Sequence, residues 1–302
     1  MKVNEPKVGI IILNYVTYQL TISLVNSISS FDYKKFFVII VDNKSPNESY
    51  IELSNYLSTN KFHFDVHLIE SDKNGGYSYG NNIGAKRANE LGADYTVIMN
   101  NDIEFTNNNL LKDLISPLEN DDSYAIACPK IININQNIVE DPMLFNKRNI
   151  YYHTFDFLIY HLKRICPFLN REPKLNNNHI FMGSGSCFMV NSKFFKEIGY
   201  FDEKIFMYGE EYILGEKVYQ ANKKVLYIPS VKVIHKHRLT TKNFFKEIDV
   251  IRMGRKSKYY YFKKYRKINF VTLAIWNFRL WLEYDVYKFF LFKVFGKQNF
   301  LQ

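Results

Sequence analysis

The sequence predicts an α/β protein with a mostly parallel sheet flanked by helices. Continuous runs of β-branched and other apolar residues, typical of strands covered on both faces, alternate with segments of helical periodicity. Polar residues also follow these runs directly, at Asn14, Asp42, Asn74 and Asp102. Ligands of open α/β sheets bind at the carboxyl ends of strands, so these four are candidate site residues. Asn and Asp are also ordinary turn formers, and position alone does not choose between the two interpretations.

The first half of the chain contains four predicted strands. The runs VGIIIL, FFVIIV and YTVIM are uninterrupted and apolar, as expected of strands buried on both faces. A helix is predicted over 17–29 because apolar residues recur there at helical spacing, and another follows the glycine turn at 74–76 as far as about Leu91. The four strands are predicted at 8–13, 36–41, 66–69 and 95–99.

The pattern weakens between Pro129 and about His179, where polar, basic and aromatic residues mix irregularly. We interpret about 130–180 as a variable insertion. Order then returns, with an apolar run at 180–190, a helix from about 191, the turn GYFDE at 199–203, a helix over 210–221 and a last strand at 225–228. This pattern predicts a main domain over 1–251 and a separate C-terminal segment over 252–302.

Composition excludes several classes of protein. With 47% hydrophobic and 17% aromatic residues, the chain is not disordered. Its three cysteines, at 128, 166 and 187, lack CxxC spacing, which disfavours a structural zinc site and a secreted disulfide scaffold and favours a reducing cytosol. The start shows no signal-peptide pattern. The stretch from Ile268 to Phe278 is too short to cross a bilayer, which takes about 20 apolar residues, so no transmembrane helix is expected.

The glycine turn NGGYSYGNN lacks the GxGxxG pattern of dinucleotide-binding enzymes, and no P-loop motif occurs. The segment Asn100-Asn101-Asp102 follows a strand, and a carboxylate there can hold a divalent cation that neutralises a diphosphate. A second ligand could come from His235, although an isolated histidine is more often only packed near a strand end. The adjacent acids Glu210 and Glu211 either favour a helix start or supply a general base.

The chain contains seven short motifs whose order along the sequence resembles that in family 2 glycosyltransferases with the GT-A fold, of the type that builds bacterial surface polysaccharides. The resemblance covers about Val8 to His235. The motifs are the strand ending ILNY, VDNKSPN at 41–47, NGGYSYGNNIG at 74–84, MNND at 99–102, GYFDE at 199–203, YGEEYILGEKV at 208–218 and VIH at 233–235.

The resemblance implies a role for each matching residue. It implies that Asp42 recognises the nucleotide base, with Asn14 and Tyr15 nearby, and that Asn74, Gly75 and Asn81 close over the nucleotide and its ribose. The DxD-like metal motif corresponds to Asn100, Asn101 and Asp102, with Asp102 as the direct ligand and His235 completing the site for Mn²⁺ or Mg²⁺. Glu211 takes the place of the base that deprotonates the acceptor hydroxyl.

The implied activity is inverting, metal-dependent transfer of a sugar from a UDP- or dTDP-linked donor to a growing, lipid-linked oligosaccharide. Asn100 departs from the family pattern by removing one anionic ligand, and Glu210 remains a competitor for the role of base. Residues 130–180 would then lie on the acceptor side of the catalytic domain. The alternative is a membrane-docked, non-catalytic scaffold or binding protein with a degenerate glycosyltransferase fold.

The net charge of +10 lies entirely in the C-terminal segment. Residues 252–302 hold twelve Lys and Arg and two acids, whereas residues 1–251 are neutral overall. Aromatic residues follow the basic ones, as in an interfacial helix on anionic lipid. This pattern predicts peripheral attachment to a membrane surface, and the resemblance implies the cytoplasmic face of the cell membrane. A helical subdomain packed on the core is the alternative, and no nucleic-acid-binding motif accompanies the charge.

Overall fold

The computed structural model describes residues 5–133, 138–140, 142–151, 153, 178–236 and 247–282. The chain forms two compact units. The first comprises Met1–Leu144 with Leu175–Ser257, and the described residues of the second lie within 145–153 and 258–282. Each unit is described separately below.

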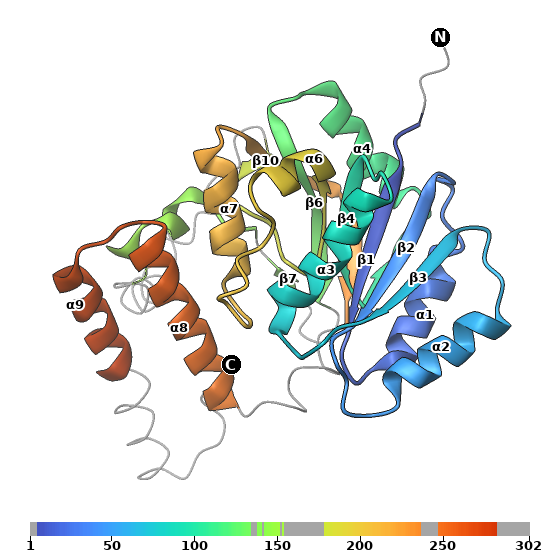
Figure 1. The fold of residues 1–302 in the computed structure, drawn as a ribbon. Coiled ribbons are helices and arrows are strands. Elements are labelled where there is room, and N and C mark those ends of the chain that lie inside the picture. The colour runs from blue at the N-terminus through green and yellow to red at the C-terminus, as the bar shows by residue number, and fades with distance from the viewer. Residues whose placement is uncertain are drawn as a thin grey trace. The chain divides into compact units, whose positions relative to one another are not determined.

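A single sheet of ten strands forms the centre of the first unit (Figure 1). Its main path runs β3-β2-β1-β4-β9-β6-β10-β5, with β7 paired to β6 and β8 to β10. Strands β3, β2, β1, β4, β6 and β10 point in one direction, and β9 is inserted antiparallel between β4 and β6. This confirms the predicted α/β architecture. The strands are β1 Val8–Asn14, β2 Phe36–Asp42, β3 Asp65–Glu70, β4 Tyr95–Asn100, β5 Ile103–Phe105, β6 Tyr124–Asn133, β7 Ile138–Glu140, β8 His179–Ile180, β9 Cys187–Asn191 and β10 Lys224–His235.

Helices cover both faces of this sheet because alternate strand residues point to opposite sides. Ile10 and Ile12 of β1 join the core beneath α1, α2 and α4, whereas Ile11 joins the core beneath α3, α6 and α7. The central strands β1 and β2 are almost completely buried as a result. The helices are α1 Tyr18–Ile28, α2 Ser49–Thr59, α3 Gly76–Glu90, α4 Leu110–Asn120, α6 Ser192–Glu197 and α7 Glu210–Gln220.

Several elements extend beyond the predicted pattern. Helices α2 and α4 and the whole of β6 were not expected, and β6 runs past Pro129, where the regular pattern was expected to end. Strand β10 is also much longer than its predicted range of 225–228, because it resumes after a register shift between Ile228 and Lys232. Pro229 lies in this shift, where a residue without an N–H is tolerated.

The second unit is helical in its described part. Helix α8, Glu247–Lys264, crosses the boundary between the two units, and α9, Phe270–Trp281, follows it, with a short 3-10 helix at Phe145–Arg148. Phe262 packs edge-on against Trp276 and against His153, and all three side chains are buried. Among the described residues, no helix is long and apolar enough to span a bilayer.

Candidate active site

The predicted polar residues lie at one edge of the sheet. The parallel register places Asn14, the last residue of β1, beside Asp42, the last residue of β2. Leu13 lies opposite Asn100 at the end of β4, and β10 ends at His235. The strand ends therefore bring together residues that are far apart in the sequence.

Asp42 is fully buried, and three donors hold its carboxylate. Its Oδ2 accepts hydrogen bonds from Asn14 Nδ2 at 2.7 Å and Ser45 Oγ at 2.7 Å, and its Oδ1 accepts from the Ser45 amide at 2.9 Å. Asn14 in turn accepts from Thr21 Oγ1 of α1 at 2.8 Å. Tyr15 follows β1 and is half-buried. These bonds fix the orientation of Asp42 without any ligand.

A glycine turn leads into α3 beside this network. Asn74 Oδ1 accepts from the Gly76 amide at 3.1 Å and from Asn43 Nδ2 at 3.0 Å. Gly76 has φ +83°, and a Cβ there would lie 2.0 Å from the Phe206 carbonyl oxygen, so only glycine fits. Gly75 also lacks room for a Cβ. The absence of a side chain at Gly76 thus allows the backbone of this turn to lie directly against the backbone at Phe206.

One buried amide oxygen in α3 lacks a partner. Asn81 donates from Nδ2 to the Tyr77 carbonyl oxygen at 3.0 Å, but its Oδ1 has no hydrogen-bond partner among the described residues. Leaving a buried acceptor unsatisfied costs about 1–3 kcal/mol. A bound ligand with a hydroxyl group would satisfy Asn81 Oδ1.

Asp102 and His235 form a buried pair. Asp102 Oδ1 lies 3.1 Å from His235 Nε2, and each residue is only 5% exposed. Donor atoms at neighbouring positions of an octahedral Mg²⁺ or Mn²⁺ ion lie about 3 Å apart, so the spacing fits joint coordination. No cluster of three or more His, Cys, Asp or Glu side chains suited to a metal was found in the described residues. Water and phosphate oxygens would complete such a site, as is common for Mg²⁺.

The two asparagines before Asp102 make contacts within the protein. The Asn100 amide donates to the Ser186 carbonyl oxygen at 2.8 Å, which joins the end of β4 to the turn before β9. Asn101 is buried and donates from Nδ2 to Thr17 Oγ1 at 2.9 Å and to Thr21 Oγ1 at 3.0 Å. The structure thus places the Asn101 amide nitrogen against the start of α1.

Two glutamates begin α7 after Gly209, whose φ of +116° favours glycine. Glu210 is buried, and its Oε2 has no hydrogen-bond partner among the described residues. Burial, and then the charge of Glu211, raise the pKa of Glu210 well above its ordinary value. Glu211 is only partly buried. Adjacent carboxylates therefore occupy different environments.

Tyr77 was not among the predicted site residues, and it contacts Gly185 in the turn before β9. Tyr77 donates its hydroxyl hydrogen to the Gly185 carbonyl oxygen at 2.5 Å. A Cβ at Gly185 would lie 3.0 Å from Glu211 Oε1 and 3.4 Å from the Tyr77 hydroxyl. Burial, followed by the charges of Glu210 and Glu211, raises the pKa of Tyr77. Tyr77 lies inside the motif NGGYSYGNN, which was the available sequence signal.

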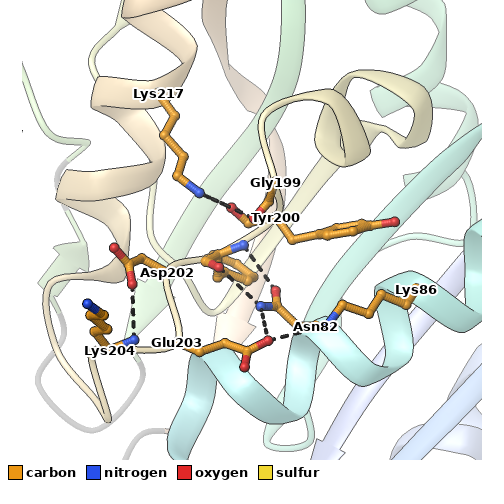
Figure 2. Close-up of polar contacts among 9 residues, drawn as sticks. Asn82, Lys86, Gly199, Tyr200, Asp202, Glu203, Lys204 and Lys217 are labelled. Atoms are coloured by element: carbon orange, nitrogen blue, oxygen red, sulfur yellow. Dashed lines mark hydrogen bonds and ion pairs between the residues drawn. The ribbon is translucent and has the colours of Figure 1, made fainter.

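The motif GYFDE joins α3 to α7 (Figure 2). Asn82 of α3 accepts from the Phe201 amide at 3.0 Å and donates to the Phe201 carbonyl at 3.1 Å and to Glu203 Oε1 at 2.8 Å. Lys217 of α7 donates to the Tyr200 carbonyl oxygen at 2.6 Å. The motif thus connects the helix after the glycine turn with the helix that carries Glu211.

The family model and the curated relatives that match this chain are all glycosyltransferases. The sequence model of "Glycosyl transferase family 2" matches residues 9–199. A low-salt glycan biosynthesis hexosyltransferase from Haloferax volcanii is 27% identical over 229 residues, which span 71% of this chain and 65% of that protein. An N-acetylglucosaminyl-diphospho-decaprenol L-rhamnosyltransferase from Mycobacterium tuberculosis is 42% identical over 52 residues, 17% of each chain. The chain thus matches less than two thirds of the length of these curated relatives.

Similar folds also occur among solved structures. A mannosyltransferase from Pyrobaculum calidifontis in complex with GDP-Man and Mn²⁺ has a TM-score of 0.60, with 13% sequence identity. The similarity covers 92% of this chain and 70% of that one. It supports the GT-A fold expected from the motifs. The family match spans more than half of the sequence, and the chain therefore belongs to glycosyl transferase family 2.

Proposed function

We propose that the protein is an inverting, metal-dependent glycosyltransferase that uses a nucleotide sugar. The observation that carries this proposal is the buried Asp102–His235 pair at the strand edge, with a spacing that suits a divalent ion. When bound there, Mn²⁺ or Mg²⁺ would offset the negative charge on the diphosphate leaving group. Asp102 and His235 would hold the ion.

The donor nucleotide would lie beside β1, β2 and the start of α3. In this proposal Asp42, with Asn14 and Tyr15, recognises a pyrimidine base, which suits UDP or dTDP. Asn74, Gly75 and Asn81 close over the nucleotide and ribose, and the unsatisfied Asn81 Oδ1 would accept a ribose hydroxyl. Asn100 and Asn101 position the metal motif through their contacts with Ser186 and α1.

Glu211 would act as the general base. Its carboxylate is less buried than that of Glu210 and adjoins Gly185, in the turn that also binds the end of β4 through Ser186. Glu211 would take the proton of the acceptor hydroxyl while that oxygen attacks the anomeric carbon. The bond from the anomeric carbon to the diphosphate oxygen breaks in the same step, which inverts the configuration.

The proposed acceptor is a lipid-linked oligosaccharide in surface-polysaccharide synthesis. The name of the Mycobacterium tuberculosis relative specifies a decaprenol-linked substrate, which supports this assignment over a short matched region. The basic segment 252–302 would hold the enzyme peripherally at the cytoplasmic face of the membrane.

A donor panel tests the proposal. Purified protein with Mn²⁺ or Mg²⁺ should release UDP or dTDP from at least one nucleotide sugar in the presence of an extract of lipid-linked acceptors. In D102N and H235A, Mn²⁺ together with UDP or dTDP should no longer raise the Tm. If neither wild-type turnover nor metal-dependent nucleotide binding is measurable across the panel, the proposal is wrong.

The variant E211Q separates an enzyme from the scaffold alternative. Loss of a general base should lower kcat by about 100-fold or more while the Kd for the nucleotide stays the same. The matched control is E197Q, which makes the same change at an exposed glutamate of α6 and should behave like wild type. Equal transfer rates in the two variants would exclude Glu211 as the base.

A further inference from the structure

Exposed apolar side chains gather on one helix of the second unit. Six of the nine large apolar residues that are exposed in the described part of the chain fall within 270–282. Phe270 is 78% exposed and Val271 64%, which is unusual for rings and branched chains on a protein in water. The six are Phe270, Val271, Ile275, Phe278, Trp281 and Leu282.

Helix α9 has two separate apolar faces. Leu273, Trp276 and Leu280 are buried and recur at helical spacing, so they form the side packed within the unit. At 100° per residue the six exposed residues fall on a different arc of about 140°. We call this arc the α9 outer face. A surface helix ordinarily has a single apolar face, which packs on the core. The second apolar face of α9 therefore indicates contact with a binding partner.

The charge around this face restricts what the occupant can be. Residues 258–282 contain six Lys and Arg and no acid, namely Lys258, Lys263, Lys264, Arg266, Lys267 and Arg279. A second copy of the chain would bring the same positive charges together across the contact, which opposes self-association. A lipid surface with an apolar interior and anionic headgroups would contact the exposed apolar side chains and also attract the positive charges around them.

We propose that the α9 outer face inserts into a membrane surface rich in anionic lipid. The apolar arc would enter the boundary between headgroups and acyl chains, with the basic residues at the level of the lipid phosphates. Phe278 and Trp281 stack with ring centroids 5.8 Å apart, and together they form a broad aromatic wedge. The inference deepens the membrane location proposed above, because it names the lipid class and the residues that would touch it.

Tryptophan fluorescence can report this contact in the full-length protein. The chain has two tryptophans: Trp276 is buried, whereas Trp281 is 45% exposed on the outer face. Phosphatidylcholine vesicles containing phosphatidylglycerol should shift the emission to the blue, and brominated acyl chains should quench it. W281F should abolish both changes but still sediment with vesicles, because phenylalanine keeps the apolar contact.

A matched pair of variants tests the face itself. I275S removes an isoleucine that is 57% exposed on α9, and I51S makes the same change at a 59% exposed isoleucine of α2. I275S should lower the partition coefficient on anionic vesicles about tenfold, and I51S should leave it unchanged. Circular dichroism of both variants should match wild type, since each altered side chain is exposed.

Three results would overturn the inference. These are equal partitioning of I275S and I51S, partitioning that is the same with and without phosphatidylglycerol, and a concentration-dependent dimer in lipid-free buffer that I275S dissociates. The last result would make the outer face a contact between copies of the chain. Release of UDP or dTDP in a detergent-solubilised assay is measured in parallel, so failure of the membrane inference is distinguishable from failure of the proposed activity.

Discussion

The neighbouring carboxyl groups of Glu210 and Glu211, at the start of α7, differ in their exposure to solvent. Glu210 is buried, and its Oε2 has no hydrogen-bond partner within the described part of the chain, whereas Glu211 is partly buried beside Gly185. Burial makes the charged form of Glu210 unfavourable, and a charge on Glu211 makes it more so. Glu210 therefore holds a proton over a range of pH in which an exposed glutamate has lost it.

This difference predicts a pH-dependent stability. Between the ordinary carboxyl pKa and the raised pKa of folded Glu210, the folded protein keeps a proton that the unfolded chain has released. The free energy of unfolding therefore falls as the pH rises through this interval. E210Q removes the titration, so it should be more stable than wild type at about pH 8, with a difference that shrinks towards about pH 4.

Urea unfolding followed by far-UV circular dichroism measures the effect. E197Q is the control, because Glu197 is exposed on α6, and it should follow wild type at every pH. A difference between E210Q and wild type that is constant with pH would show that Glu210 does not titrate between the folded and unfolded states in this way.

At the same scale, sequence patterns located strand-end residues better than helix residues. Asn14 and Asp42 are the last residues of β1 and β2, and Asp102 follows the end of β4. The carboxyl ends of parallel strands meet at the same side of the sheet, whatever the conformation of the connecting loops. Tyr77 could not be singled out, because its contact with Gly185 depends on where two segments more than a hundred residues apart meet. The roles of all these residues in binding and transfer remain predictions.

At the scale of elements, α3 and α7 are connected through the loop at 199–203. Asn82 of α3 and Lys217 of α7 both form hydrogen bonds with the backbone of this loop. Asn82 satisfies the amide and the carbonyl of Phe201, both within a buried environment. N82A would leave these backbone groups without their partner, so we expect the free energy of unfolding to fall by about 2–3 kcal/mol. The rate of transfer should also fall, because the loop positions the helix that carries Glu211.

The matched control is N89A, on the same helix. Asn89 is half-buried, and its amide donates to the Ala85 carbonyl one turn earlier and to the Tyr200 hydroxyl. This variant should lose less than about 1 kcal/mol. Thermal or urea unfolding of both proteins checks the prediction, which fails if the two variants are equally destabilised.

The same elements show which parts of the fold a sequence pattern can predict. Strands β1, β2 and β4 were predicted almost to the residue, because burial on both faces makes them continuously apolar. Helix α2 was missed because few of its residues are buried, so its apolar periodicity is weak. Strand β10 was cut short because Pro229 and the register shift interrupt the pattern in the middle of a single strand.

On the scale of the whole molecule, the two units differ in what holds them together. The first unit is organised around a sheet with a core on each face. The described core of the second is small and consists of a few large side chains, including Tyr261, Phe262 and Trp276. Because less apolar surface is removed from water, the second unit should be the less stable.

Both tryptophans lie in the second unit, which gives this unit its own optical signal. In urea, tryptophan fluorescence should therefore report an earlier transition than far-UV circular dichroism, which is dominated by the helices and strands of the first unit. W281F leaves the buried Trp276 as the one tryptophan, and its fluorescence, excited selectively at about 295 nm, should show the same early midpoint. Coincident fluorescence and circular-dichroism curves would instead mean that the chain unfolds as one cooperative body, with the stability of α9 supplied by the first unit.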